Sequence, residues 1–216
     1  EMIELATHGG INYHPSMLPK FRGGSAINWA IINGETETGV TIHFIDEGVD
    51  KGPILLQEKV DITPDDTVKS LYFGKLYPLG IRMIAEAVRL IREGKATPTD
   101  QDESLASFQP VISTSDTVID WKQSTETIYN LIRGSNPSPG AVTRLGEQTC
   151  ALYDATPGDQ QDTPGTVIEI GPDTFTVATG DGAIAVSSAK PPGQKKLAAS
   201  DFVTRLNLTV GDQFTS

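Results

Sequence analysis

A series of short strand-like segments in the last third of the chain constrains the fold most. The β-rich segments span residues 141–145, 148–153, 166–170, 174–178 and 183–188. Turn residues separate several of them, as at Gly146-Glu147, Gly171-Pro172-Asp173 and Gly180-Asp181-Gly182. Short strands at this spacing, joined by glycine-containing turns, predict a small antiparallel β barrel.

The first half of the chain mixes helix and strand patterns, which indicates the α/β class. Residues 25–33 predict a short helix, with Ser25 as its N-cap and Gly34 at its end. Residues 39–45 and 54–62 are rich in β-branched side chains and predict two strands. Residues 10–13 are expected to end a strand of a parallel sheet. The loop between the two predicted strands, residues 46–52, contains two glycines and carries Asp50.

A longer helix is expected after residue 63. Residues 63–67 place a proline and two acidic residues at its start, and Pro78 is expected to kink it. Gly94 is expected to end it. The apolar residues that follow Pro78 at helical spacing are Ile81, Ile84, Ala85, Val88 and Ile91. This stripe predicts the face that packs on the sheet. Residues 96–117 show no period and predict a linker, followed by a short helix at 124–133.

Composition narrows the class of protein. The chain has 216 residues, 38% of them hydrophobic and 21% charged, which is typical of a globular protein. No apolar stretch is long enough for a membrane span, so no membrane partner is expected. Cys150 is the single cysteine, which excludes an internal disulfide, fits the cytoplasm, and predicts a small core or strand residue.

The net charge also bears on partners. The formal charge is −11, which disfavours a polyanion such as nucleic acid as the general partner. Lys190, Lys195 and Lys196 leave a local basic patch open, with a solvated loop as the alternative interpretation.

Three polar residues form the candidate catalytic set. Asn12 and His14 lie in Asn12-Tyr13-His14-Pro15-Ser16, and Asp50 ends Asp46-Glu47-Gly48-Val49-Asp50. An amide can donate to a carbonyl oxygen, an imidazole can move a proton near neutral pH, and a carboxylate can hold that imidazole charged. A nearby ionised Asp50 is expected to raise the pKa of His14. Together the three residue types suit acyl transfer.

The spaced motifs resemble the formyltransferase family that uses 10-formyltetrahydrofolate. They comprise residues 10–19, Arg22-Gly23-Gly24, Thr38-Gly39-Val40-Thr41 and residues 46–53. The resemblance implies the C-terminal part of a Rossmann-like catalytic domain at residues 1–112, with a linker at about 96–116. An OB-like β barrel at 117–216 would follow. It also implies that the chain, which begins at Glu1, lacks the first half of that catalytic domain.

The resemblance assigns roles to single residues. Asn12 would donate to the formyl oxygen, and His14 would stabilise the oxyanion or move the proton. Asp50 would set the charge of His14 and help to remove the proton of the nucleophile. Asp46 and Gly48 are expected to contact the folate. Arg22 is expected to meet a folate or acceptor anion, with a surface charge as the equal alternative. 10-Formyltetrahydrofolate would be the formyl donor.

The acceptor stays open at this point. Methionyl-tRNA, water in a hydrolase, and an amino sugar are all compatible with the motifs. A catalytically inactive or truncated paralogue that acts as a binding module is the alternative to an enzyme. His43 is expected to be structural and His8 a loop residue. No zinc-type spacing of His or Cys is present, so no metal is expected.

Overall fold

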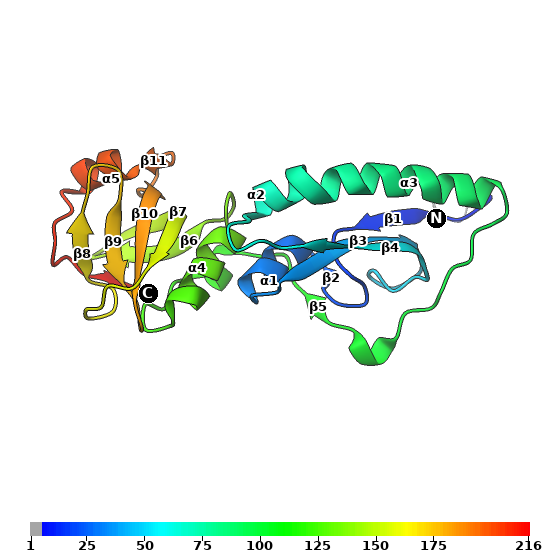
Figure 1. Cartoon of the computed structure of the whole chain (residues 1–216), viewed down its shortest axis with the longest axis horizontal. Coiled ribbons are helices and arrows are strands. Elements are labelled where there is room, and N and C mark those ends of the chain that lie inside the picture. The colour runs from blue at the N-terminus through cyan, green and yellow to red at the C-terminus, as the bar shows by residue number, and fades with distance from the viewer. Residues whose placement is uncertain (1–5) are drawn as a thin grey trace. The chain divides into compact units, whose positions relative to one another are not determined.

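The computed structural model describes residues 6–216 (Figure 1). The chain divides into two compact units, one made of residues up to 30 with 35–111, and the other of residues 31–34 with 112–216. The first unit mixes helices with a small sheet, and the second is built mainly of strands. The α/β class with a separate barrel is thereby confirmed. The division falls inside the segment whose sequence predicts a linker.

The three-stranded sheet of the first unit is antiparallel, and the parallel neighbours expected for the strand at residues 10–13 stay a prediction. Its strands β1 (Ile11–His14), β3 (Glu37–Phe44) and β4 (Ile54–Asp61) lie in the order β1-β3-β4. The loop from residue 45 to residue 53 joins β3 to β4 and is too short for the crossover that a parallel pair needs. β1 is a strand, as predicted, and His14 is its last residue.

The segment after residue 95 does more than link the units. It contains η3 (Glu103–Leu105), β5 (Phe108–Gln109) and η4 (Thr114–Thr117). Strand β5 pairs in parallel with β2 (Arg22–Gly23), which leads toward α1 (Ala26–Ile32). The part up to residue 109 therefore packs on the first unit.

The long helix has a π turn at its predicted kink. α2 (Val68–Leu71) continues through the π turn η2 (Tyr72–Leu76) into α3 (Tyr77–Arg92). Pro78 has no amide hydrogen, and such a residue inside a helix disturbs the hydrogen bonds of the preceding turn. The helix begins at Val68, after the capping residue Thr67, so the two acidic residues precede it instead of occupying its first turn.

The face of α3 that packs on the sheet is not the predicted stripe. The buried residues of α3 are Leu79, Gly80, Met83 and Ala87, whereas Ile81, Ile84 and Val88 are 55%, 39% and 43% exposed. A Cβ atom at position 80 would lie 2.2 Å from Cε2 of Tyr13, so the glycine permits close contact with β1. Figure 1 shows α3 running along the sheet.

The second unit is a closed β barrel flanked by α4 (Thr125–Gly134) and α5 (Ala199–Leu206). Its strands are β6 (Ala141–Leu145), β7 (Gln148–Gly158), β8 (Val167–Ile170), β9 (Phe175–Ala178), β10 (Ala183–Lys190), β11 (Leu197–Ala198) and β12 (Phe214–Thr215). They follow the order β12-β6-β7-β10-β9-β8, with β11 on β10. The two ends of the sheet meet, because Val167 N donates to Asp212 O and Phe214 N to Gly165 O, each at 2.8 Å.

Aromatic side chains fill the barrel core. The ring of Phe175 stacks on Phe202 of α5 at 5.4 Å between centroids and on Phe214 at 6.0 Å. Cys150 is 2% exposed in the same core, as predicted. Within residues 6–216, no helix has the length and apolar character needed to cross a membrane.

Candidate active site

Strand β1 sets the direction of two of the three predicted catalytic residues. Alternate residues of a strand point to the same side, so Asn12 and His14 share a face. In the antiparallel register, Asn12 lies opposite His43 and His14 lies opposite Thr41. His43 therefore faces Asn12 across the sheet.

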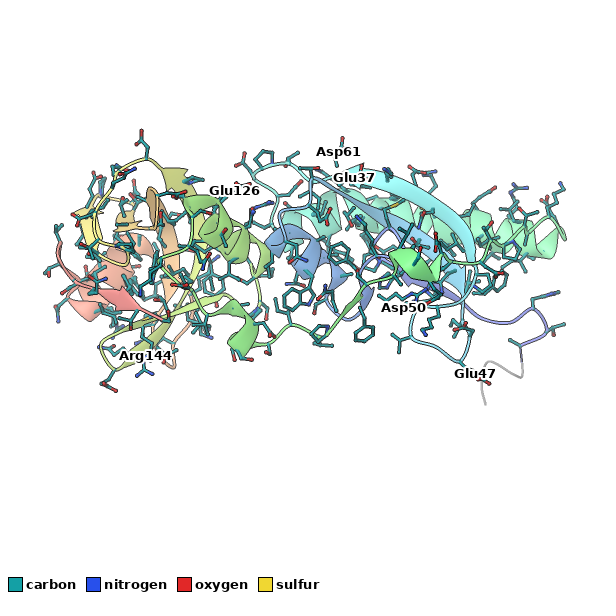
Figure 2. All side chains as sticks on the ribbon, turned by 90° about the horizontal axis from the view of Figure 1, so that it is seen from below. Glu37, Glu47, Asp50, Asp61, Glu126 and Arg144 are labelled. Carbon is teal, nitrogen blue, oxygen red and sulfur yellow. The ribbon has the colours of Figure 1, made fainter. Side chains whose placement is uncertain are left out.

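Asp50 joins this pair from the loop between β3 and β4, where Figure 2 labels it with Glu47. Its Oδ1 accepts a hydrogen bond from Asn12 Nδ2 at 3.2 Å, and its Oδ2 accepts one from the backbone N–H of Gly23 at 2.8 Å. Nδ1 of His14 lies 3.5 Å from the same Oδ2. One carboxylate thus lies against both other residues of the predicted set.

The surroundings of His14 keep its imidazole neutral near pH 7. Its ring is 4% exposed, and Nε2 lies 2.8 Å from the carbonyl oxygen of Phe21. A carbonyl can only accept, so Nε2 carries the hydrogen and Nδ1 presents its lone pair toward Asp50. Burial lowers the pKa of His14 below 6.5, although the Phe21 carbonyl and Asp50 both raise it. The expected rise in this pKa is therefore wrong, because desolvation outweighs the carboxylate.

His43 takes up one of the two amide hydrogens of Asn12. Nδ1 of His43 lies 2.8 Å from the carbonyl oxygen of Phe44 and must donate to it. Nε2 then accepts from Asn12 Nδ2 at 3.2 Å. With the other hydrogen on Asp50, Asn12 must release one partner before it can donate to a formyl oxygen. His43 is buried as expected of a structural residue, but it also belongs to the site. His8 lies in a turn, as predicted.

Sequence reasoning missed Gln101. Its Nε2 donates to the backbone oxygens of Asp50 and Gly52, each at 2.8 Å, and its Oε1 accepts from Arg22 Nη2 at 2.8 Å. Gln101 lies in the segment without periodicity, between residues typical of loops. No local pattern marks it; the pairings of residue 99 with β4 before it and of β5 with β2 after it bring it to the site.

The three predicted folate-contact residues already have partners inside the protein. Arg22 is 3% exposed, and its guanidinium donates to both carboxylate oxygens of Glu103 at 2.9 and 2.7 Å. Asp46 is exposed, and its Oδ1 accepts from the backbone N–H of Gly48 at 2.9 Å, which closes a turn. Folate contact by Arg22, Asp46 and Gly48 stays a prediction. For Arg22 it requires an exchange of Glu103 for the ligand.

A cavity of about 300 Å³ opens beside the loop that carries Asp50. It is lined by Arg22, Val49, Lys51, Ala106, Ser107 and Phe108. Val49 and Lys51 flank Asp50 in sequence, so the cavity lies next to the carboxylate loop. Its two cationic side chains lie near the Glu103 carboxylate, which interacts electrostatically with both. Within residues 6–216, no group of three or more His, Cys, Asp or Glu side chains is arranged to hold a metal ion.

Two family models match the chain. Residues 1–76 match the model described as formyl transferase, and residues 111–207 match the one described as formyl transferase, C-terminal domain. The methionyl-tRNA formyltransferase of Geobacter metallireducens is 38% identical over 210 residues, which cover 97% of this chain and 67% of that protein. The one from Syntrophus aciditrophicus is 39% identical over 213 residues, covering 97% and 68%. The chain spans about two thirds of the length of these relatives.

Solved structures show the same fold. HypX from Aquifex aeolicus in complex with tetrahydrofolic acid superposes with a TM-score of 0.79 at 23% identity, over 94% of this chain and 36% of that one. At that identity the likeness shows the fold alone. The N-formyltransferase from Helicobacter canadensis, in complex with folinic acid and dTDP-3-aminofucose, has a TM-score of 0.65 at 25% identity. That match covers 84% of this chain and 65% of the other.

Proposed function

The chain belongs to the formyl transferase family, and on that premise we propose that Asn12, His14 and Asp50 transfer a formyl group from 10-formyltetrahydrofolate to an amine. The observation that carries the proposal is the shared carboxylate: Asp50 bonds Asn12 through Oδ1 and faces His14 Nδ1 through Oδ2. An amide donor and a proton carrier are thereby held at one point, which formyl transfer requires.

The residues of the site fit a folate formyl donor. When bound, the folate supplies the formyl group on one of its nitrogen atoms. Asn12 offers a hydrogen-bond donor for the formyl oxygen, and His14 offers a basic nitrogen for the proton that the acceptor amine loses. The printed names of the structural neighbours include tetrahydrofolic acid and folinic acid, which supports a folate here as well.

His14 is the proton carrier in this proposal. Its neutral ring accepts the proton of the attacking amine at Nδ1, because Nε2 is already protonated and bound to Phe21 O. The imidazolium that forms has an acceptor at each nitrogen, Phe21 O at 2.8 Å and Asp50 Oδ2 at 3.5 Å. His14 then gives the proton to the leaving nitrogen of the folate, so that the proton count balances.

Asn12 stabilises the negative charge that develops on the formyl oxygen. Its amide nitrogen has two hydrogens; the one on Asp50 keeps the side chain oriented, and the one on His43 is exchanged for the formyl oxygen. Such donors act most strongly where charge appears only in the transition state. Asp50 therefore positions Asn12 and stabilises the charged form of His14 with the same group.

Methionyl-tRNA is the acceptor that we propose first. The curated relatives named above are methionyl-tRNA formyltransferases, and they match nearly the whole chain at 38% and 39% identity. The acidic composition of the chain disfavours a polyanionic partner, so a tRNA would have to bind through a local basic surface. Water and an amino sugar, the latter named in the neighbour from Helicobacter canadensis, become alternative outcomes of the test.

The test is release of deformylated folate by the full natural protein, followed by absorbance with and without aminoacylated initiator tRNA. Release that depends on methionyl-tRNA, with formylated methionyl-tRNA as the product, supports the proposal. Release without any amine would identify a hydrolase, and release only with an amino sugar would change the acceptor. No release in any case would favour the inactive paralogue.

A further inference from the structure

We propose that Gln101 is the positioning residue that sets the place of the Asp50 carboxylate, an inference that rests on the function proposed above. Gln101 bonds two backbone oxygens of the loop that carries Asp50. It also bonds Arg22, and the next residue, Gly23, donates its N–H to the Asp50 side chain. It acts through Asp50 and has no chemical step of its own.

The amide nitrogen of Gln101 binds the loop that carries Asp50. Its Nε2 donates to the backbone oxygen of Asp50 and to that of Gly52, each at 2.8 Å. A side-chain amide nitrogen has two hydrogens, so both are used. The two accepting carbonyls lie on either side of Lys51, which fixes this stretch of the loop from within.

The acceptor half of the same amide faces Arg22. Oε1 accepts from Arg22 Nη2 at 2.8 Å and from Nε at 3.2 Å. Because one end meets two carbonyls and the other meets a guanidinium, the amide has only one acceptable orientation. Rotation by half a turn would place an oxygen against two oxygens and an N–H₂ group against a cation.

These bonds close a ring around Asp50. Gln101 bonds the backbone of Asp50, Arg22 bonds Gln101, and Gly23, the next residue after Arg22, donates its N–H to Asp50 Oδ2 at 2.8 Å. Asp50 has a φ angle of +53°, a left-handed conformation that residues other than glycine rarely adopt. Such a conformation persists when the surrounding bonds determine it.

The segment that carries Gln101 is itself anchored to the first unit. Thr99 and Ile54 exchange two backbone hydrogen bonds of 2.8 Å, and β5 pairs with β2 beyond the Glu103 ion pair with Arg22. Gln101 is thus held at both ends before it bonds the loop. The geometry of the reacting groups tolerates little error, since a displacement of about 1 Å can cost about 100-fold in rate.

The first variant to test is Gln101→Met in the full natural protein, which keeps the length of the side chain and removes every hydrogen bond of the amide. We expect kcat to fall about 10- to 100-fold while KM for the folate changes by less than about threefold. Gln101→Glu is the second variant, because it keeps the acceptor for Arg22 and loses both donors to the loop. We expect a loss of kcat in it as well.

Gln160→Met is the matched control, because it makes the same change at an exposed glutamine of the second unit. We expect its kcat to stay within about threefold of the wild type. Glu103→Gln removes the anionic partner of Arg22 and leaves all bonds of Gln101 in place. A loss in Glu103→Gln as large as in Gln101→Met would assign the effect to Arg22 and overturn the inference. Thermal melting of each variant shows that a folded protein is compared.

A double-mutant cycle with Asp50→Asn decides whether Gln101 acts through Asp50. If it does, adding Gln101→Met to Asp50→Asn lowers kcat by less than about twofold further. A full multiplicative loss in the double variant would overturn the positioning role while leaving the proposed function intact. Wild-type activity in Asp50→Asn alone would instead overturn the proposed function, and the inference with it.

Discussion

Asn12 and His43 lie directly opposite each other on β1 and β3, with Nδ2 of Asn12 3.2 Å from Nε2 of His43. This contact makes His43 a competitor for the amide hydrogen that a formyl oxygen needs. It also places a second imidazole near His14, with ring centroids 6.5 Å apart. His43 therefore influences both the proposed oxyanion donor and the proposed proton carrier.

Replacement of His43 by phenylalanine keeps a buried ring and removes its two ring nitrogens, including the acceptor for Asn12. The electrostatic effect of His43 lowers the pKa of His14, so the replacement should raise that pKa. Because neutral His14 is the active form, the acid limb of the kcat/KM profile moves to higher pH. A profile between about pH 5 and pH 8 measures this shift. An acid limb that stays in place or moves to lower pH would contradict the assignment of His14.

Replacement of Asn12 by alanine removes the donor for the formyl oxygen. We expect kcat to fall about 100- to 1000-fold, which is the usual cost of removing one oxyanion donor. Steady-state kinetics with the folate donor and methionyl-tRNA measure it. Asn33→Ala changes an exposed asparagine just after α1 and serves as the control with wild-type kcat. An equal kcat in both variants would remove Asn12 from the mechanism.

The buried imidazole of His14 makes folding stability depend on pH. Its pKa in the folded state lies below 6.5, so the unfolded chain binds more protons. The free energy of unfolding therefore decreases as the pH falls below about 6.5 toward the folded-state pKa. Urea denaturation at about pH 7.5 and about pH 5.5 measures the decrease, which His14→Gln should reduce. An unchanged pH dependence in that variant would mean that other groups cause it.

Gly23 is needed both for its backbone conformation and for the space around it. Its φ angle is +93°, and a Cβ atom would lie 2.4 Å from the backbone oxygen of Gln109. Gly23→Ala should destabilise the protein by about 1–3 kcal/mol and lower kcat, because the N–H that binds Asp50 shifts.

Gly94→Ala is the control for Gly23→Ala, because it introduces backbone strain without a close contact. Gly94 also has a positive φ angle, +66°, but nothing lies within 4 Å of its Cβ position. We expect a cost of about 1 kcal/mol and wild-type kcat, with both quantities measured by denaturation and kinetics. If Gly23→Ala behaves in the same way as Gly94→Ala, the contact with β5 is unimportant for the site.

The sequence predicted the elements with strong local signals. Turn glycines and β-branched residues located the barrel strands, and the short helix predicted at 124–133 corresponds to α4. α5 escaped prediction because its N-cap is Ala198, which makes no side-chain cap bond. The packed face of α3 was predicted wrongly because both faces carry apolar residues, and the packed face is the one on which Gly80 allows close contact with Tyr13.

The same limit applies to the candidate site. The motifs named Asn12, His14 and Asp50, and the structure brings them together. Gln101 lies 51 residues from Asp50 in sequence and has no local signal. Whether the pKa of His14 is raised or lowered depends on how the effect of burial compares with the opposing effect of Asp50. The sequence does not show how deeply the imidazole is buried.

The most direct test of the central claim is the kcat of Asp50→Asn for formyl transfer to methionyl-tRNA by the full natural protein. One carboxylate positions Asn12 and stabilises the charged form of His14, so its loss should lower kcat at least about 100-fold. KM for the folate should change by less than about threefold. A kcat within about threefold of the wild type would contradict the claim that Asp50 both positions Asn12 and stabilises charged His14.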